Sequence, residues 1–154
     1  MTMRLTTVRN TNQEAIIHFA TSTAESGTIT IASLAAATQE LISGGTPTVN
    51  ITRFVTTGED GASLSVFRNS ELIIASAPEN APFLDLTTFG VSEAQGNTHD
   101  VVITSNVSKA VTGYIVLRKL AGWATKVETV TYGAYDDVTR VGASTTMSGS
   151  PDKV

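Results

Sequence analysis

The chain has 154 residues, which is enough for one domain with a sizeable core and short for two. Its charged fraction is 16% and its formal net charge is −4, and the lack of a dense basic cluster argues against nucleic-acid binding. The absence of cysteine excludes disulfides and thiolate chemistry, and no segment approaches the ~20 apolar residues of a membrane-spanning helix.

Segments in which apolar and polar side chains alternate recur along most of the chain, the pattern of half-buried β-strands. Turn-forming residues separate these segments, most clearly at 58–61 and at 68–71, where a tight hairpin is predicted. This spacing predicts an all-β fold, an antiparallel β-sandwich or barrel that is jelly-roll-like, with at most one short helix. In chain order, strands are expected at residues 3–9 (a strand or an arm), 14–21, 28–31, 49–57, 63–67, 72–76, 83–87, 100–104 and 113–120.

One segment, residues 33–42, fits two descriptions. Ser33 is a suitable N-cap, several helix formers follow it, and Gly44 is a suitable stop. However, ten residues form a marginal helix without tertiary packing, and both flanks read as β-structure. We therefore expect either a short helix or an irregular loop here.

The character of the sequence changes after Trp123. Residues 127–132 still alternate, whereas residues 133–154 are polar and glycine-rich and carry only isolated apolar side chains. Such a segment buries too little surface to offset its ordering entropy alone, so it is either a disordered terminus or an arm that orders against a neighbouring subunit. The predicted organisation is an N-terminal arm or first strand at 1–12, a β-domain at 13–132 and an extended C-terminal arm or tail at 133–154.

Catalytic chemistry has weak support in this sequence. His18 lies in the middle of a predicted strand, and His99 precedes Asp100 at the start of another. A triad of Ser105, His99 and Asp100 would need the acid to orient the imidazole. Adjacent residues on a strand point to opposite faces, so we do not expect His99 and Asp100 to pair, and no catalytic residue is assigned.

Metal and glycan sites have no better support. The acidic turns at 59–60 and 136–137 lack the alternating spacing of a calcium loop. Two matches to the N-glycosylation pattern, at Asn50 and Asn106, are expected by chance in a chain rich in serine and threonine. No metal, cofactor or small-molecule substrate is therefore expected.

The aromatic residues near the C-terminal end are the best candidates for contact with a partner. Trp123, Tyr132 and Tyr135 lie close in sequence to Lys119 and Lys126. Aromatic side chains beside basic groups anchor protein interfaces and stack on sugars. Trp123 follows a glycine at a strand end, so it fits equally a plug at the bottom of the β-domain.

Several segments resemble small virion structural proteins of tailed phages that infect marine bacteria and cyanobacteria. The similarity covers about Arg4 to Trp123, and the extension that follows lies outside it. It implies a cysteine-free β-domain assembled in many copies on a head or tail, and no enzyme activity. The segments that carry it are Arg9-Asn10-Thr11-Asn12-Gln13-Glu14-Ala15, Val49-Asn50-Ile51, Val66-Phe67-Arg68-Asn69 and Gly113-Tyr114-Ile115-Val116-Leu117-Arg118-Lys119.

The expected function is therefore that of a non-enzymatic virion protein, most specifically a capsid decoration (cement) protein. Its expected partners are the major capsid protein, other virion proteins and copies of itself, with no nucleic acid or membrane. Residues 1–7 lack the apolar stretch of a secretion signal, so synthesis in the host cytoplasm and localisation on the virion are expected. The alternatives are a neck or tail structural protein, and a carbohydrate-binding β-sandwich that uses Trp123 and the tyrosines for sugar stacking.

Overall fold

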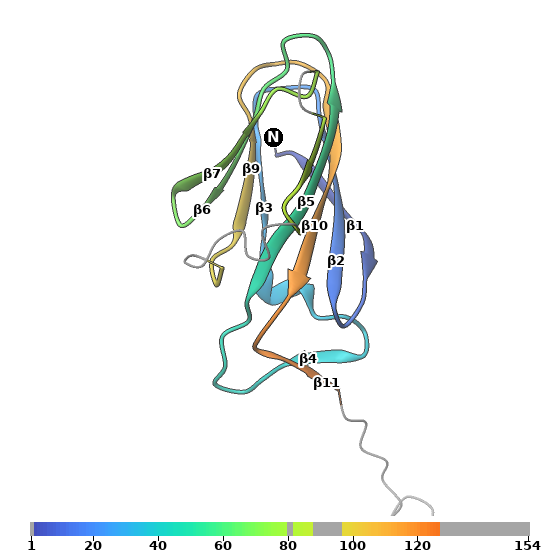
Figure 1. The fold of residues 1–154 in the computed structure, drawn as a ribbon, viewed down its shortest axis with the longest axis vertical. Helices are drawn as coiled ribbons and strands as arrows, with labels where there is room; N and C mark the ends of the chain where they lie inside the picture. The colour runs from blue at the N-terminus through green and yellow to red at the C-terminus, as the bar shows by residue number, and fades with distance from the viewer. Residues whose placement is uncertain (1, 80–81, 88–96, 127–154) are drawn as a thin grey trace, which may run out of the picture.

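The computed structural model describes residues 2–79, 82–87 and 97–126 (Figure 1). The described part of the chain is built from β-strands and one short 3-10 helix, all strand pairs being antiparallel. The predicted all-β class is therefore confirmed. The elements are β1 (Arg4–Asn10), β2 (Glu14–Thr21), β3 (Ser26–Ile29), η1 (Ile31–Leu34), β4 (Gln39–Leu41), β5 (Val49–Gly58), β6 (Leu64–Arg68), β7 (Glu71–Ser76), β8 (Phe83–Asp85), β9 (Val101–Ser105), β10 (Val111–Lys119) and β11 (Trp123–Thr125).

The strands form two facing sheets and a small closing ribbon. One sheet has the order β1-β2-β10-β5-β8 and the other the order β3-β9-β6-β7, while β4 and β11 pair across one end (Figure 1). The chain crosses between the sheets from β2 to β3, from β3 through β4 to β5, from β5 to β6, from β7 to β8, from β8 to β9 and from β9 to β10. This interleaved order of two four-stranded sheets, with β1 added beside β2, is that of a jelly roll.

The core lies between the two sheets and is filled by the inward residues of each alternating strand. In β9 the buried residues are Val101, Ile103 and Ser105, separated by partly exposed ones. Phe19 of β2 and Phe54 of β5 stack with their ring centroids 5.5 Å apart, and both are almost fully buried. Alternation of this kind is what the sequence pattern predicted, because burying one face of a strand requires a period of two.

The ambiguous segment 33–42 does not form a helix of that length. A 3-10 turn at Ile31–Leu34 buries Ile31 and Leu34 against the core, and the chain then extends into β4. The amide of Gln39 donates to the carbonyl of Ala36, which closes a turn where a helix would continue. Several boundaries differ from expectation: β3 begins at Ser26 and ends at Ile29 where the sequence predicts residues 28–31, β8 ends at Asp85 instead of residue 87, and β10 begins two residues early at Val111.

The predicted hairpin at 68–71 is confirmed. Asn69 and Ser70 have φ values of 51° and 64°, which connect β6 to β7 through two left-handed residues. Positive φ at both central positions is the geometry of a type I′ turn, whose twist matches that of the paired strands. Asparagine tolerates this conformation better than most residues, which explains its place at the first position.

Arg68, at the end of β6, is a buried charged side chain that connects the two sheets. It is 1% exposed. Its guanidinium donates to the carbonyl oxygens of Val49 (2.7 Å), Asn97 (2.8 Å) and His99 (2.8 and 3.0 Å). Val49 begins β5 in the five-stranded sheet, whereas Asn97 and His99 lead into β9 of the four-stranded sheet. The side chain therefore fixes the distance between the sheets at this end of the core.

The outermost strands of both sheets are short or irregular. The pairing of β1 with β2 shifts register between Thr7 and Arg9, so Val8 bulges out. At the other edge of the same sheet β8 has 3 residues, and β3 has 4. The pairing of the fourth edge strand, β7, with β6 shifts register between Val66 and Phe67.

Replacing Gly113 in the middle of β10 should destabilise the sandwich. A Cβ atom at this position would collide with the carbonyl oxygen of Val55 and lie 2.6 Å from Cζ of Phe19. We expect Gly113→Ala to lower the free energy of unfolding by on the order of 3 kcal/mol, because a packed core does not yield to an added methyl group. Urea denaturation followed by circular dichroism measures the change. Thr57→Ala, at an exposed position on the adjacent strand, is the control and should cost less than about 1 kcal/mol; equal losses would contradict the steric argument.

Candidate functional site

Trp123, the predicted anchor residue that lies within the described chain, is engaged inside the molecule. It begins β11, is half-buried and packs against the core cluster. Its indole Nε1 donates to the carbonyl of Thr48 at 3.0 Å, and the ammonium of Lys119 lies 4.9 Å from the ring centroid. These contacts close the bottom of the sandwich. Partner binding by Trp123 stays a prediction.

Lys119 is buried at this end of the molecule and connects the elements that meet there. It is 7% exposed, and its ammonium donates to Asn10 Oδ1 (2.6 Å), the Thr11 carbonyl (2.8 Å) and Gln39 Oε1 (2.6 Å). The lysine thus links β10 to the β1–β2 turn and to β4. Burial lowers the pKa of Lys119 from 10.5 to about 8, because removal from water disfavours the charged form.

The other two predicted anchors, Tyr132 and Tyr135, lie outside the described residues, as do the predicted strand 127–132 and the arm 133–154. The predicted grouping of Trp123 with the two tyrosines is therefore not tested by the described part of the chain. Their role in partner binding stays a prediction.

The residues considered for a hydrolytic triad bond to different partners. The Asp100 carboxylate accepts a hydrogen bond from the amide of Ile31 at 3.0 Å, and the Ser105 hydroxyl donates to the carbonyl of Val107 at 2.9 Å. His99 Nδ1 lies 3.4 Å from the Thr98 hydroxyl. Ser105, His99 and Asp100 thus show no relay of the kind that activates a nucleophile.

The strand register reveals a surface that the sequence analysis did not identify, the outward side of the five-stranded sheet. Residues directly opposite one another in an antiparallel sheet share a face, so the pairing of β10 with its neighbours assigns this side row by row. We call it the outer face. It comprises Arg4, Thr6, Arg9, Glu14, Ile16, His18, Ala20, Asn50, Arg53, Val55, Thr57, Phe83, Asp85, Thr112, Tyr114, Val116 and Arg118.

An apolar and aromatic row crosses the middle of the outer face. His18, Tyr114, Val55 and Phe83 are consecutive cross-strand neighbours from β2 to β8. The Tyr114 and Phe83 side chains are 44% and 55% exposed, although large apolar side chains are normally covered. The His18 and Tyr114 rings lie 5.0 Å apart, and His18 Nε2 lies 2.8 Å from the hydroxyl of Thr112. Contacts with neighbouring side chains thus hold His18 and Tyr114 in place, while Tyr114 and Phe83 remain exposed to solvent.

Four arginines surround this row: Arg4, Arg9, Arg53 and Arg118, all exposed. They are four of the ten basic residues of the chain, whereas the outer face carries two of its fourteen acidic ones. This side of an acidic protein is thus locally basic. Arginine and aromatic residues are the types enriched at the energetic centres of protein interfaces.

One of the two acids, Asp85, is held in its charged form. It lies opposite Arg53 in the sheet. Hydrogen bonds from the hydroxyl and then the amide of Thr87 lower the pKa of Asp85, and the charge of Arg53 adds a smaller effect. The outer face therefore keeps a fixed negative charge beside its basic ones.

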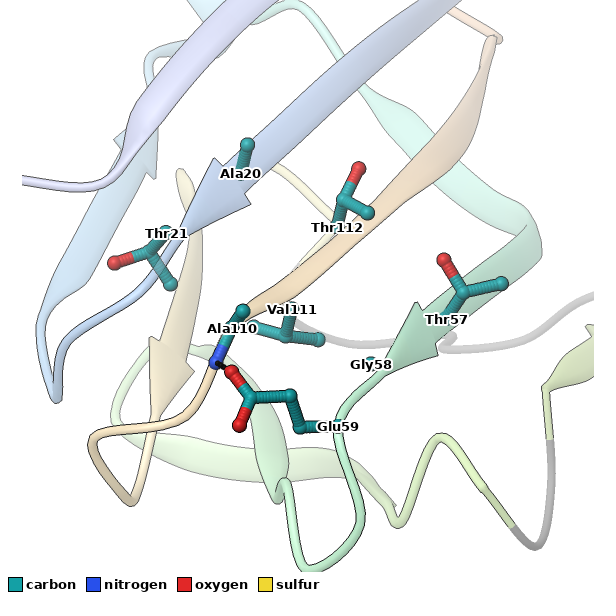
Figure 2. Close-up of a pocket in the computed structure, with 8 residues that line it drawn as sticks. All are labelled: Ala20, Thr21, Thr57, Gly58, Glu59, Ala110, Val111 and Thr112. Carbon is teal, nitrogen blue, oxygen red and sulfur yellow. Dashed lines mark hydrogen bonds between the residues drawn. The ribbon is translucent and has the colours of Figure 1, made fainter.

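A hollow of about 470 Å³ lies at one end of the outer face (Figure 2). Ala20, Thr57 and Thr112, which form one row of that face, contribute to its lining. The Glu59 carboxylate stands at its edge and accepts a hydrogen bond from the amide of Ala110 at 2.8 Å (Figure 2). The lining consists mainly of methyl and hydroxyl groups from alanine, valine and threonine, with the one carboxylate of Glu59.

Tyr114 and Phe83 were missed because each looks like an ordinary residue of an alternating strand. The exposed position of Tyr114 between buried Gly113 and Ile115 is visible in the alternation of β10. That His18, Tyr114, Val55 and Phe83 are neighbours is not visible, since they belong to four strands whose order only the fold gives.

Comparisons with known proteins complete the description of this surface. No protein-family model, curated protein or solved structure matched the chain. Within the described residues, no group of three or more histidine, cysteine or acidic side chains is placed to hold a metal ion. The same part of the chain contains no helix long and apolar enough to cross a bilayer.

The lowered pKa of Lys119 predicts how stability responds to alkaline pH. Because the folded chain loses this proton near pH 8 and the unfolded chain near 10.5, the unfolded state binds more protons in between. The free energy of unfolding should therefore rise with pH across this interval, relative to a variant without the group. Urea denaturation at pH 7.5, 9 and 10 measures the slope, and Lys119→Met should remove it. An identical slope in both proteins would contradict the assignment.

Proposed function

We propose that the chain is a non-enzymatic structural protein of a tailed-phage particle, and most specifically a capsid decoration protein that binds the head through repeated protein–protein contacts. The observation that supports this best is the outer face: a five-stranded sheet surface with an exposed aromatic row bordered by arginines. An open sheet face suits contact with a protein surface better than it suits a small substrate, which is usually enclosed in a cleft.

The composition supports the same proposal. Charged residues make up 16% of the chain, and uncharged polar side chains outnumber charged ones at the exposed positions of the described residues. Such surfaces are buried against neighbours at a lower desolvation cost than charged ones. Jelly rolls occur in viral capsid proteins, and also in lectins and cupins, so the topology is compatible with the proposal without deciding it.

The test of the proposal is binding to empty phage heads that lack decoration. The purified full chain should saturate the heads at a fixed ratio of copies to capsid subunits, measured by light scattering and by sedimentation of the complexes. A chain that closes into a ring by itself and ignores heads would place the protein at the neck or tail. A chain that does neither would contradict a structural role on the particle.

Removal of residues 133–154 should weaken attachment to heads while leaving the β-domain folded. Strands β1 to β11 all precede this segment, so the sandwich keeps its core. Contacts repeated at many sites strengthen binding through avidity, so loss of this contact should lower the apparent affinity by about 100-fold or more, from the low end of ~10²–10⁴ for linked sites. Quantitative co-sedimentation measures the affinity, and circular dichroism confirms folding. Unchanged affinity of the truncated protein would show that the arm takes no part in attachment.

A specific observation favours carbohydrate binding as a second candidate. Tyr114 is exposed and lies opposite Val55, one row from the threonine-lined hollow. An aromatic ring beside several hydroxyl groups is an arrangement that stacks on a sugar and bonds to its hydroxyls. Trp123, by contrast, is occupied by Lys119 and Thr48.

Glycan-array binding tests this candidate. If the chain binds sugars at the outer face, Tyr114→Ala should abolish the signal, because the stacking ring is lost. Leu72→Ala, at an exposed apolar position on β7 of the other sheet, is the matched control and should leave it unchanged. A blank array with the unmodified chain would remove carbohydrate binding from consideration.

A further inference from the structure

We infer that the outer face is the docking site for residues 127–154 of a neighbouring copy of this chain. The inference rests on the proposed function, because a repeated array is what supplies neighbours at high local concentration. It names the surface that would receive the C-terminal segment. Four properties support this contact: the charge of the face, the charge of the segment, the length of the segment and the area of the face.

Charge disfavours the simplest self-association, in which two outer faces pair with each other. The face carries four arginines against Glu14 and Asp85. A symmetric dimer through this face would bring together two surfaces of the same net positive charge, which costs free energy. A different surface that carries carboxylates is the better complement.

The C-terminal segment has the complementary chemistry. It contains four acidic residues (Glu128, Asp136, Asp137 and Asp152) against two basic ones, Arg140 and Lys153. It also contains the two tyrosines and the alternating apolar residues of 127–132. The face offers an apolar and aromatic row between arginines, so both the charged and the apolar parts of the segment have counterparts there.

Length allows the segment to reach a neighbour. The described chain ends at Lys126, just after β11 at the bottom of the sandwich (Figure 1). The following 28 residues of the sequence span up to about 90 Å when extended. Strand β10, with 9 residues, crosses the whole outer face in about 30 Å. The segment is therefore long enough to leave its own sandwich and cross the next one.

The outer face is also large enough to hold a partner. Its five strands have 7, 8, 9, 10 and 3 residues, and at about 3.4 Å per residue and 4.8 Å between strands they present on the order of 600 Å². Specific interfaces bury about 800 Å² on each side, so the face supplies most of what such a contact needs. Because each copy would give one segment and receive another, the contact is head-to-tail and builds rings or arrays.

Two full-length variants, each defective in one half of the contact, provide the test, and neither needs phage heads. The face variant carries Tyr114→Glu and Arg53→Glu. The segment variant carries Tyr132→Ser, Asp136→Lys and Asp137→Lys. The unmodified chain should show an average mass that rises above 16.1 kDa with concentration in light scattering, and more so in 50 mM than in 500 mM salt. Each variant alone should remain at the monomer mass.

An equimolar mixture of the two variants should form a one-to-one complex of twice the chain mass and no larger species, because one intact face meets one intact segment. Leu72→Glu, exposed on the opposite sheet, is the control and should associate like the unmodified chain. Circular dichroism verifies that every variant folds.

Three outcomes would overturn the inference. A chain that stays monomeric up to 1 mM does not bind its neighbours through this contact. A segment variant that associates like the unmodified chain shows that another surface occupies the face. Association of the face variant shows that the contact lies elsewhere. A chain that saturates heads while staying monomeric in solution would retain the proposed function and lose only this inference.

Discussion

The buried guanidinium of Arg68 is the interaction on which the arrangement of the two sheets depends. Moving a charged group out of water is costly, and the cost is offset only when its donors are satisfied. Here the carbonyls of Val49, Asn97 and His99 receive them, and these residues belong to segments of both sheets. A shift of one sheet against the other would break these bonds inside the core. Arg68 therefore fixes the position of one sheet relative to the other. The outer face is one side of the five-stranded sheet, so its position depends on the same contacts.

The sequence predicts those features of the structure that are determined by residues close together in the chain. The strands predicted at residues 14–21, 49–57 and 100–104 are present at nearly these bounds, because the apolar pattern that predicts each one lies within the segment itself. The hairpin after Arg68 is likewise predicted by its turn residues. The helix considered for 33–42 fails because burial of Ile31 and Leu34 against the core overrides the helix preference of the residues that follow.

The candidate site is harder to predict because it is not local. His18, Tyr114 and Phe83 are separated by tens of residues and become neighbours only through the crossings of a jelly roll. The aromatic residues near the C-terminal end are predicted as a binding site because they are close in sequence. In the structure, however, Trp123 contacts Lys119 and Thr48 of its own chain. Proximity along a β-chain is a poor guide to proximity on its surface, because adjacent residues face opposite ways.

The irregular outermost strands have a consequence for how such a protein resists aggregation at high concentration. A regular edge strand is a template onto which another chain adds without limit, as in amyloid. In this fold the bulge at Val8 interrupts one edge, and the 3 residues of β8 offer little length at the other. Open-ended growth along the backbone is thus discouraged at both sides of the sheet that bears Tyr114. Partners are then recognised through side chains, which distinguish one partner from another. Backbone N–H and C=O groups at the strand edges, which would pair with any extended chain, take little part.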